Sequence, residues 1–477
     1  MKNIFYFCIL FSTTIMQAQT SDSLQVLSPE QMKEDVLFFY KKIEEIHPNP
    51  YCVLDKKQYE IKKQELLNSL DKPMNEIEFW LKISQLQSIY DAHTGIVQPN
   101  KTIDFLIEKK SLFFFNGLQK VHNYCLYWNS LEGIPDGLKN REILMINNVK
   151  INEIINNMTN YISCENNTII NKNLNYRFCI LYPLLYNYPQ ELHIEYLDKD
   201  TNKNITLTMD DFMQWDSISR PFWETIEPYS FKFYEDEGIA IFELNSFSES
   251  EKLQFEQFDK DLADAIDFLN KSNIKHLFVD ITRNEGGGSR FADAFLDYLN
   301  IPKRTYFGEV THKISKENRE KRGFNNFKSY RKIFYSQFAR DMLLTKKGKT
   351  FTRKYYYTKK QKPCTYYDNV YLLQSNTTFS AAIRLSSFFK YYNFGTIIGE
   401  ETGGLTACYI DSSAFRLPNS NLLTFCSTMK SVEPGGKWDG RGVLPDIEYK
   451  IENQEKSFTL EQLKEMLQLV EEYNKNQ

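Results

Sequence analysis

Strands and helices alternate along the second half of this chain, and this alternation constrains the fold more than any other feature. The runs "GIAIFEL" (238–244), "KHLFVDI" (275–281), "NVYLLQS" (369–375) and "GTIIGEE" (395–401) are apolar and rich in β-branched residues, which predicts strands. Segments with helical spacing separate them, at 250–271 and from residue 380. Because strand–helix–strand alternation favours parallel pairing with crossover helices, the sequence predicts an α/β fold.

Ser380 lies in the stretch "NTTFSAAIRL" (376–385), where a predicted strand gives way to a predicted helix. Serine is a common N-cap, and the junction alone favours this interpretation. The same position also suits a nucleophile, because the N–H of Ala381 and the helix dipole would stabilise an oxyanion beside the hydroxyl. Both interpretations remain open at this point.

Three consecutive glycines follow a predicted strand in "VDITRNEGGGS" (279–289). Glycines let the backbone adopt positive φ and approach a ligand closely, and their N–H groups can face a developing negative charge. A tight strand-to-helix turn would explain them equally well.

A serine nucleophile needs a base, and the chain has six histidines. His93 stands out because it follows an aspartate in "DAHTG" (91–95), at the end of a predicted helix, where it could project into a cleft. A single histidine is more often structural, so this observation alone does not assign it.

The N-terminal half shows a different pattern of predicted secondary structure. Helices are expected from Ser28 to Pro48 and from Asn75, each with a capping-box signature, and a last helix from Thr459. Residues of about 100 to 212 are rich in strands. We therefore expect five parts: a signal peptide (1–19), an N-terminal helical domain (20–99), a third domain (100–215), a core (216–455) and a C-terminal helix (456–477).

The first nineteen residues have one lysine, an apolar run and polar residues around Ala18, which predicts a secretory signal peptide. No later stretch approaches the ~20 apolar residues that a membrane span needs. We expect an exported, soluble protein, periplasmic or secreted. The net charge of −4 favours neither nucleic acid nor a membrane surface as partner.

Two further compositional features bear on sites. The seven cysteines after Cys8 form no CxxC pair and lie at no zinc spacing, so buried free thiols are favoured over disulfides and a metal site is not expected. Residues 303–362 hold nineteen Lys or Arg against four Asp or Glu and interrupt the core. This basic insertion is a solvated surface or, alternatively, a lid or docking surface for an acidic partner.

Five motifs occur in one order: "GIAIFELNSF", "LFVDITRNEGGGS", "TTFSAAIRL", "GTIIGEETGG" and "GRGVLPDIEY". Together they resemble the serine peptidase family of C-terminal processing proteases and the tricorn core. The segments "IEEIHPNPY" and "DAHT" match the helical leader of that family, and "NREILMINNVKINEI" is similar to part of its PDZ-like domain. The resemblance implies a crotonase/ClpP-like α/β core and a PDZ-like domain at 100–215, here degenerate because a clear glycine-rich carboxylate-binding loop is absent.

The resemblance also implies site residues. Ser380 occupies the position of the nucleophile, and the N–H groups of Ala381 and Gly287 would form the oxyanion hole. The processing proteases place a lysine base where this sequence has Leu405, in "GEETGGL". The tricorn-like branch uses a histidine before the PDZ-like domain, which is the position of His93.

A late carboxylate completes the tricorn arrangement. Asp439 in "WDGRGV" is the nearest match, with Glu433 as a second candidate. We therefore expect an exported serine endopeptidase acting on peptides or proteins, with no cofactor implied and no prediction of its oligomeric state. The alternative is a non-catalytic protein that binds peptides or hydrophobic ligands on the same scaffold, for which the aromatic content of 15% would be suitable.

Overall fold

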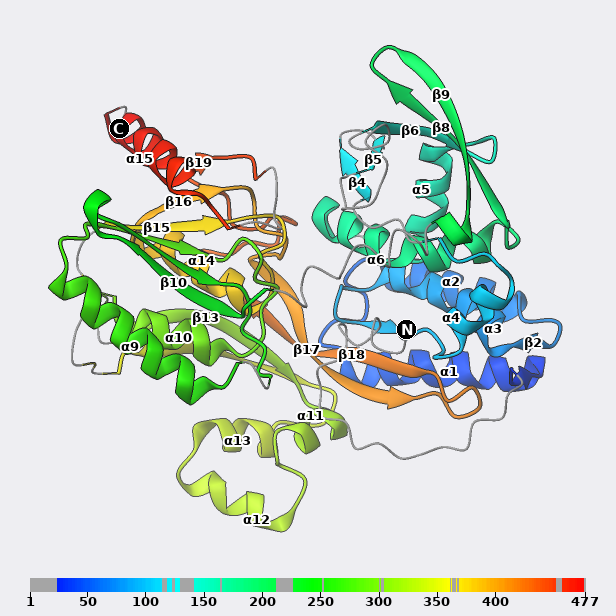
Figure 1. Cartoon of the computed structure of the whole chain (residues 1–477). Coiled ribbons are helices and arrows are strands. Elements are labelled where there is room, and N and C mark those ends of the chain that lie inside the picture. Colours follow the sequence, from blue (N-terminus) through cyan, green and yellow to red (C-terminus); the bar gives the residue numbers. More distant parts are fainter. Residues whose placement is uncertain are drawn as a thin grey trace.

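The computed structural model describes most of the chain after the predicted signal peptide and arranges it in two lobes joined by a long hairpin (Figure 1). The predicted signal peptide (1–19) lies outside the described residues. The described residues are 24–113, 118–121, 125–128, 141–163, 165–211, 226–250, 253–299, 301, 304–360, 362, 366, 369–451 and 457–475.

The N-terminal lobe begins with helices whose starts follow from the sequence. Ser28 and Gln31 form a capping box before the first helix, and Asn75 and Glu78 form another before the third. The elements in chain order are β1 (Val26–Leu27), α1 (Pro29–Ile46), α2 (Lys56–Asn68), β2 (Met74–Asn75), α3 (Glu76–Ser84), η2 (Gln85–Ile89), β3 (Gly95–Ile96) and α4 (Thr102–Glu108).

An antiparallel sheet with two helices completes this lobe, with strand order β4-β5-β6-β8-β9 and β7 paired to β6. The expectation that residues of about 100 to 212 are rich in strands is confirmed for the described part of this region. The elements are β4 (Leu118–Val121), β5 (Cys125–Trp128), β6 (Arg141–Ile146), β7 (Val149–Lys150), α5 (Ile151–Thr159), α6 (Asn167–Leu185), β8 (Glu191–Asp198) and β9 (Thr201–Thr208).

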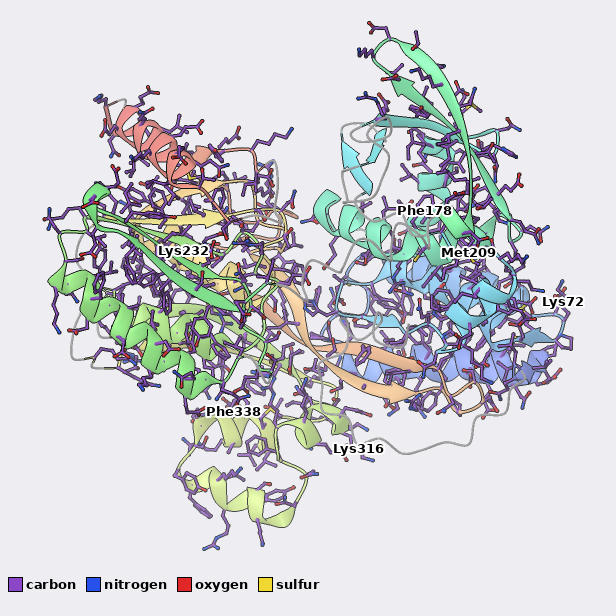
Figure 2. The ribbon with its side chains drawn as sticks, in the orientation of Figure 1. Lys72, Phe178, Met209, Lys232, Lys316 and Phe338 are labelled. Carbon is purple, nitrogen blue, oxygen red and sulfur yellow. The ribbon has the colours of Figure 1, made fainter. Side chains whose placement is uncertain are left out.

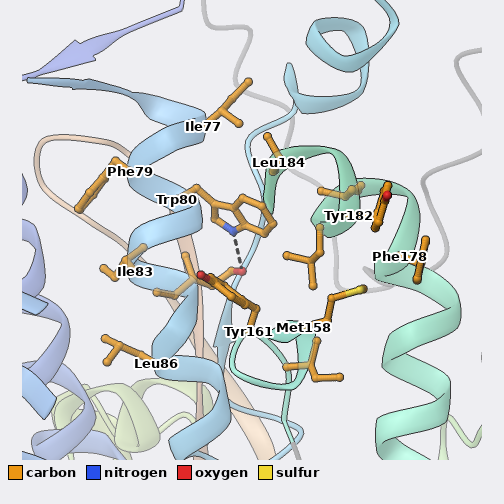
Figure 3. Close-up of a cluster of buried hydrophobic side chains, with 14 of the residues drawn as sticks. Ile77, Phe79, Trp80, Ile83, Leu86, Met158, Tyr161, Phe178, Tyr182 and Leu184 are labelled. Carbon is orange, nitrogen blue, oxygen red and sulfur yellow. Dashed lines mark hydrogen bonds between the residues drawn. The ribbon is translucent and has the colours of Figure 1, made fainter. Parts of the chain in front are cut away.

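Buried side chains from both parts merge into one core around Trp80 (Figure 3). The indole N–H of Trp80 donates to the carbonyl oxygen of Ile96 in β3 at 3.3 Å. Because β3 begins two residues after His93, this core fixes the segment that carries the histidine.

The second lobe contains the predicted parallel sheet, with order β10-β11-β12-β15-β16-β19. All neighbours are parallel except β10, which pairs antiparallel at one edge. The strands are β10 (Tyr229–Tyr234), β11 (Ile239–Leu244), β12 (His276–Asp280), β15 (Asn369–Gln374), β16 (Thr396–Gly399) and β19 (Ile447–Glu448), and the short η3 (Glu235–Glu237) joins the first two.

Helices cover both faces of this sheet, as its side-chain alternation requires. Phe242 in β11 faces a core formed with α9 (Phe255–Lys271), α10 (Ser289–Leu296) and α14 (Ala381–Tyr392). Its neighbour Ile241 faces the opposite core, against α15 (Leu460–Lys475). The mixed α/β class expected from the sequence is confirmed.

A second sheet links the lobes. It has the order β14-β13-β18-β17, and β3 of the N-terminal lobe pairs with β18. Its other strands are β13 (Arg304–Lys313), β14 (Thr350–Thr358), β17 (Ala407–Arg416) and β18 (Leu423–Val432). Leu417 and Leu422, between the last two strands, are buried in the core of the N-terminal lobe.

The basic insertion is therefore only partly an appendage, because β13 and β14 belong to this sheet. The remainder forms a small helical group with its own core: α11 (Lys316–Lys321), α12 (Phe327–Tyr330), η4 (Arg331–Phe334) and α13 (Gln337–Leu344). Figure 2 shows Phe338 in this group, with Lys316 where the group begins.

Predictions from the sequence also concern the cysteines and membrane-spanning segments. Cys52, Cys179, Cys408 and Cys426 are free thiols, of which Cys179 and Cys426 are buried. Within the described ranges, none of the helices is both long and apolar enough to cross a membrane.

Candidate active site

Ser380 occupies a strained turn between β15 and α14. Its φ is 52° and its ψ is −120°, a region that residues with a side chain rarely adopt. It stands at the N-cap position, but its side chain makes no capping hydrogen bond. The capping interpretation is therefore wrong. A serine exposed on a strained strand-to-helix turn is the arrangement of a nucleophile elbow.

Buried hydrogen bonds hold this turn against the end of β12. The hydroxyl of Thr378 donates to the carbonyl oxygen of Ile281 at 2.9 Å and accepts the N–H of Ser375 at 3.0 Å. The N–H of Phe379 donates to the carbonyl oxygen of Asn284 at 3.0 Å. The turn that carries Ser380 is thus tied to the segment that leads into the three glycines.

The glycine loop (284–288) lies directly against Ser380. A Cβ atom on Gly286, whose φ is 99°, would stand 2.6 Å from the Cβ atom of Ser380. The N–H of Gly286 donates to the side-chain oxygen of Asn284 at 2.8 Å, and the N–H of Gly288 donates to the carbonyl oxygen of Phe247 at 2.6 Å.

Among the three glycines, which all lie in the described ranges, these bonds leave the N–H of Gly287 without a partner. In the described part of the chain, neither the N–H of Gly287 nor that of Ala381 makes a hydrogen bond. The positive φ of Gly287, 131°, excludes a side chain there, since a Cβ atom would lie 2.2 Å from the carbonyl of Phe247. Two donors near the serine hydroxyl therefore remain for an anionic oxygen.

His93 is brought to this turn from a distant part of the sequence. Its ring stacks on the ring of Phe379, the residue before Ser380, with centroids 5.8 Å apart and planes at 20°. The hydroxyl of Ser412 donates to the carbonyl oxygen of His93 at 2.5 Å. The pairing of β3 with β18 anchors the following residues to the second lobe.

Two carboxylates lie beside the histidine turn. Asp91 accepts the N–H of His93 at 2.9 Å, and Glu165 accepts the N–H of Ala92 at 2.9 Å. Burial favours a raised pKa for Asp91, but hydrogen bonding and charge from His47, with the charge of His93, hold that pKa below its usual value. Burial and the charge of Asp91 raise the pKa of Glu165 to about 8.

The two late carboxylates suggested by the resemblance, Asp439 and Glu433, have different surroundings from each other. Asp439 is exposed and accepts the N–H of Arg441 at 3.1 Å. Glu433 is buried and forms an ion pair with Arg384 of α14 at 3.3 Å. Leu405, in the position of the lysine, is buried.

The structure reveals four residues that the sequence analysis does not assign: His47, Asp91, Glu165 and Asn284. His47, Asp91 and Asn284 belong to segments quoted for the resemblance, so their positions could be identified from the sequence but their contacts could not. Glu165 has no local pattern that marks it, because it contacts the histidine turn only through the fold.

Comparison with known proteins gives one family match and several similar folds. Residues 238–449 match the model of peptidase family S41. The fold is similar to mature CPAF (11% identity, TM-score 0.60, covering 88% of this chain and 92% of that chain). It is also similar to mature CPAF complexed with lactacystin (12% identity, TM-score 0.62, covering 94% and 99%).

A third similar structure is the photosystem II D1 C-terminal processing protease (12% identity, TM-score 0.47, covering 88% of this chain and 93% of that chain). A search of curated protein sequences finds no match. The match to the family model covers the parallel strands of the sheet without β10, the glycine loop and the turn of Ser380. On this match, residues 238–449 are similar to peptidase family S41, which supports a serine-type peptidase.

Proposed function

We propose that this protein is an exported serine endopeptidase in which Ser380 is the nucleophile and His93 the general base. The observation that carries the proposal is the strained backbone of Ser380, whose hydroxyl caps nothing and whose turn lies against both Gly286 and the ring-stacked pair of His93 and Phe379. Strain of this kind is retained where function requires it.

In the proposed reaction, the hydroxyl oxygen of Ser380 attacks the scissile carbonyl while His93 takes its proton and later returns it to the leaving amine. The N–H groups of Ala381 and Gly287 stabilise the oxyanion of the tetrahedral intermediate. Water then cleaves the acyl-enzyme, with His93 again accepting a proton. In this scheme Asp439 is the candidate that orients the imidazole.

The finer fold assignments belong to the same proposal. The parallel sheet with helices on both faces supports a crotonase/ClpP-like core, and the sheet of β4 to β9 with α5 and α6 supports a degenerate PDZ-like domain. Such a domain would hold substrate chains with little dependence on a free terminal carboxylate. Equal affinity for free-acid and amidated peptides is expected, and a tenfold preference for the acid would contradict this assignment.

Labelling with a fluorophosphonate probe tests the nucleophile directly, because only an activated hydroxyl reacts readily. The wild type should be labelled and should hydrolyse an unfolded protein substrate, while Ser380→Ala should do neither and remain folded. Ser336→Ala is a matched control, since Ser336 also stands at an N-cap position, before α13, but its hydroxyl does cap the helix.

Persistent labelling of Ser380→Ala would place the nucleophile elsewhere. A wild type that binds peptides but is neither labelled nor active would favour the non-catalytic binding protein. Export is tested separately, because the exported protein should begin near residue 19 or 20 when its N-terminus is sequenced.

A further inference from the structure

A buried histidine–aspartate pair lies behind the histidine turn and takes no part in the proposed reaction steps. Nε2 of His47, at the end of α1, lies 2.8 Å from Oδ2 of Asp91, and the side chains are 0% and 1% exposed. A charge is buried at this depth only where it is fully hydrogen-bonded. The hydrogen bonds that His47 and Asp91 make therefore indicate the role of this pair in the structure.

The tautomer of His47 follows from its second nitrogen. The N–H of Asn49 donates to Nδ1 at 3.1 Å, so Nδ1 is the acceptor and the ring proton is on Nε2. Nε2 therefore donates to Asp91. The ring of His47 also packs on that of Tyr409 in β17, with centroids 4.7 Å apart, which fixes its orientation.

The other oxygen of Asp91 holds the histidine turn. Oδ1 accepts the N–H of His93 at 2.9 Å and the hydroxyl of Ser427 in β18 at 2.7 Å. The N–H of Thr94 closes the turn onto the carbonyl of Asp91 at 3.2 Å. One carboxylate thus joins α1, the histidine turn and the hairpin of the second lobe.

The charge of Asp91 also acts on His93. The attraction between these two groups contributes to the low pKa of Asp91, and by reciprocity the carboxylate stabilises a protonated His93 ring. Glu165 does not substitute for it, because a pKa of about 8 leaves that carboxyl largely protonated at neutral pH. Among the described residues, the titratable groups that interact with Asp91 include His47, Cys52, His93, Glu165, Cys408, Tyr409 and Cys426.

We infer that Asp91, oriented by His47, is a positioning residue for His93. It fixes the backbone of the histidine turn and supplies the negative charge that stabilises the imidazolium formed when His93 takes the proton of Ser380. This inference rests on the proposed function of His93, and it assigns supporting roles to Asp91 and His47.

Four variants separate this role from a general contribution to folding. Asp91→Asn removes the charge, and His47→Leu removes the donor that orients Asp91. His47→Gln keeps an N–H donor that can reach Asp91. The matched control is Asp35→Asn, because Asp35 is also fully buried and accepts two backbone N–H groups, of Asn419 and Ser420, but is not among the groups that interact with Asp91.

Asp91→Asn should lower kcat about 100-fold, as misplacement of a catalytic group does, with KM changed by less than about threefold. The midpoint of the kcat/KM profile should fall by about one pH unit, because a nearby opposite charge favours the charged form. His47→Leu should behave similarly, His47→Gln should stay close to wild type, and Asp35→Asn should leave the midpoint unchanged.

A second measurement is independent of activity. NMR titration of the His93 ring in the Ser380→Ala protein, assigned by comparison with His93→Gln, should show a midpoint about one unit lower after Asp91→Asn. An unchanged His93 titration in folded Asp91→Asn protein overturns the inference, whether or not the wild type hydrolyses peptides. A wild type without hydrolysis or labelling overturns the proposed function instead, and the titration still decides the role of Asp91.

Discussion

Gly286 and Ser380 approach so closely that a Cβ atom on the glycine would stand 2.6 Å from the Cβ atom of the serine. The same added atom would lie 2.8 Å from the carbonyl oxygen of Phe379 and 2.9 Å from the backbone nitrogen of Ala381. These neighbours are the nucleophile turn and one proposed oxyanion donor. The glycine is therefore required by close approach as well as by its φ of 99°.

Gly286→Ala should abolish most hydrolysis, because the new methyl group must displace the turn of Ser380 or the glycine loop. Fluorophosphonate labelling and kcat/KM measure this. Gly323→Ala is the matched control: Gly323 also has positive φ, 68°, but nothing lies within 4 Å of the added atom. The control should lose about 1–2 kcal/mol of stability and keep its activity. Equal activity of the two variants would contradict the close-approach argument.

Ser380→Gly should make the protein inactive and more stable. A non-glycine residue at φ 52° and ψ −120° carries strain on the order of 1–3 kcal/mol, and glycine adopts this conformation without it. The gain is measured as the free energy of unfolding in urea. Ser336→Gly should have the opposite sign, since it removes a hydroxyl that caps α13 in an ordinary extended conformation. A Ser380→Gly protein that is less stable than wild type would argue against strain at this position.

Asn284 should be needed for the geometry of the glycine loop. Its side chain is buried, accepts the N–H of Gly286 at 2.8 Å and donates to the carbonyl oxygen of Leu244 at 2.8 Å. Asn284→Ala should lower the stability by about 1–3 kcal/mol and lower kcat by at least tenfold. The equally buried Asn318 of α11 donates to the carbonyl oxygen of Lys313 at the end of β13 at 2.7 Å, so Asn318→Ala should lose stability but keep kcat. If both variants keep kcat, the loop does not depend on Asn284.

Much of the second lobe could be predicted from the sequence, because its signals are local. Apolar strands, helical spacing and capping boxes identify the parallel sheet and its helices, and the strand-to-helix junction marks Ser380. The helix α2 is not identified, because only Tyr59 and Leu66 of its residues are buried and its apolar residues outline no face.

The candidate site itself could be predicted only in part. His93 lies 287 positions before Ser380 in the sequence, and it reaches the site through the pairing of β3 with β18 and the stacking on Phe379. No local pattern encodes such contacts. The pairing of His47 with Asp91 has the same origin, since it joins the end of one helix to a turn 44 residues later.

His93→Ala should lower kcat/KM by about 10²- to 10⁴-fold, the range that general-base catalysis contributes. In the wild type, kcat/KM should rise through one step between about pH 6 and 7.5, since a free imidazole titrates near ~6.5 and the negative charge of Asp91 moves this step upward. Leu405→Lys added to His93→Ala should not restore activity, because Leu405 is buried and burial of an ammonium group that lacks a matched partner is unfavourable. A flat profile from about pH 5.5 to 8 would contradict the histidine base.

The last prediction concerns Glu165, whose pKa is raised from 4.5 to about 8 in the folded protein. Between these two values the folded protein keeps a proton that the unfolded chain has lost, so the free energy of unfolding should fall as pH rises through this window. Glu165→Gln cannot ionise and can still accept the N–H of Ala92. The variant should therefore match the wild type near pH 4.5 and exceed it in Tm at pH 8.5.

Thermal unfolding from pH 4.5 to 8.5 measures this difference, with Glu153→Gln as the control because Glu153 is exposed on α5. The control should keep the slope of the wild type. A Glu165→Gln protein whose Tm follows the same slope as the wild type would show that Glu165 is ionised across this window. In that case the histidine turn lies between two carboxylates that are both negatively charged, and Asp91 is not its only source of negative charge.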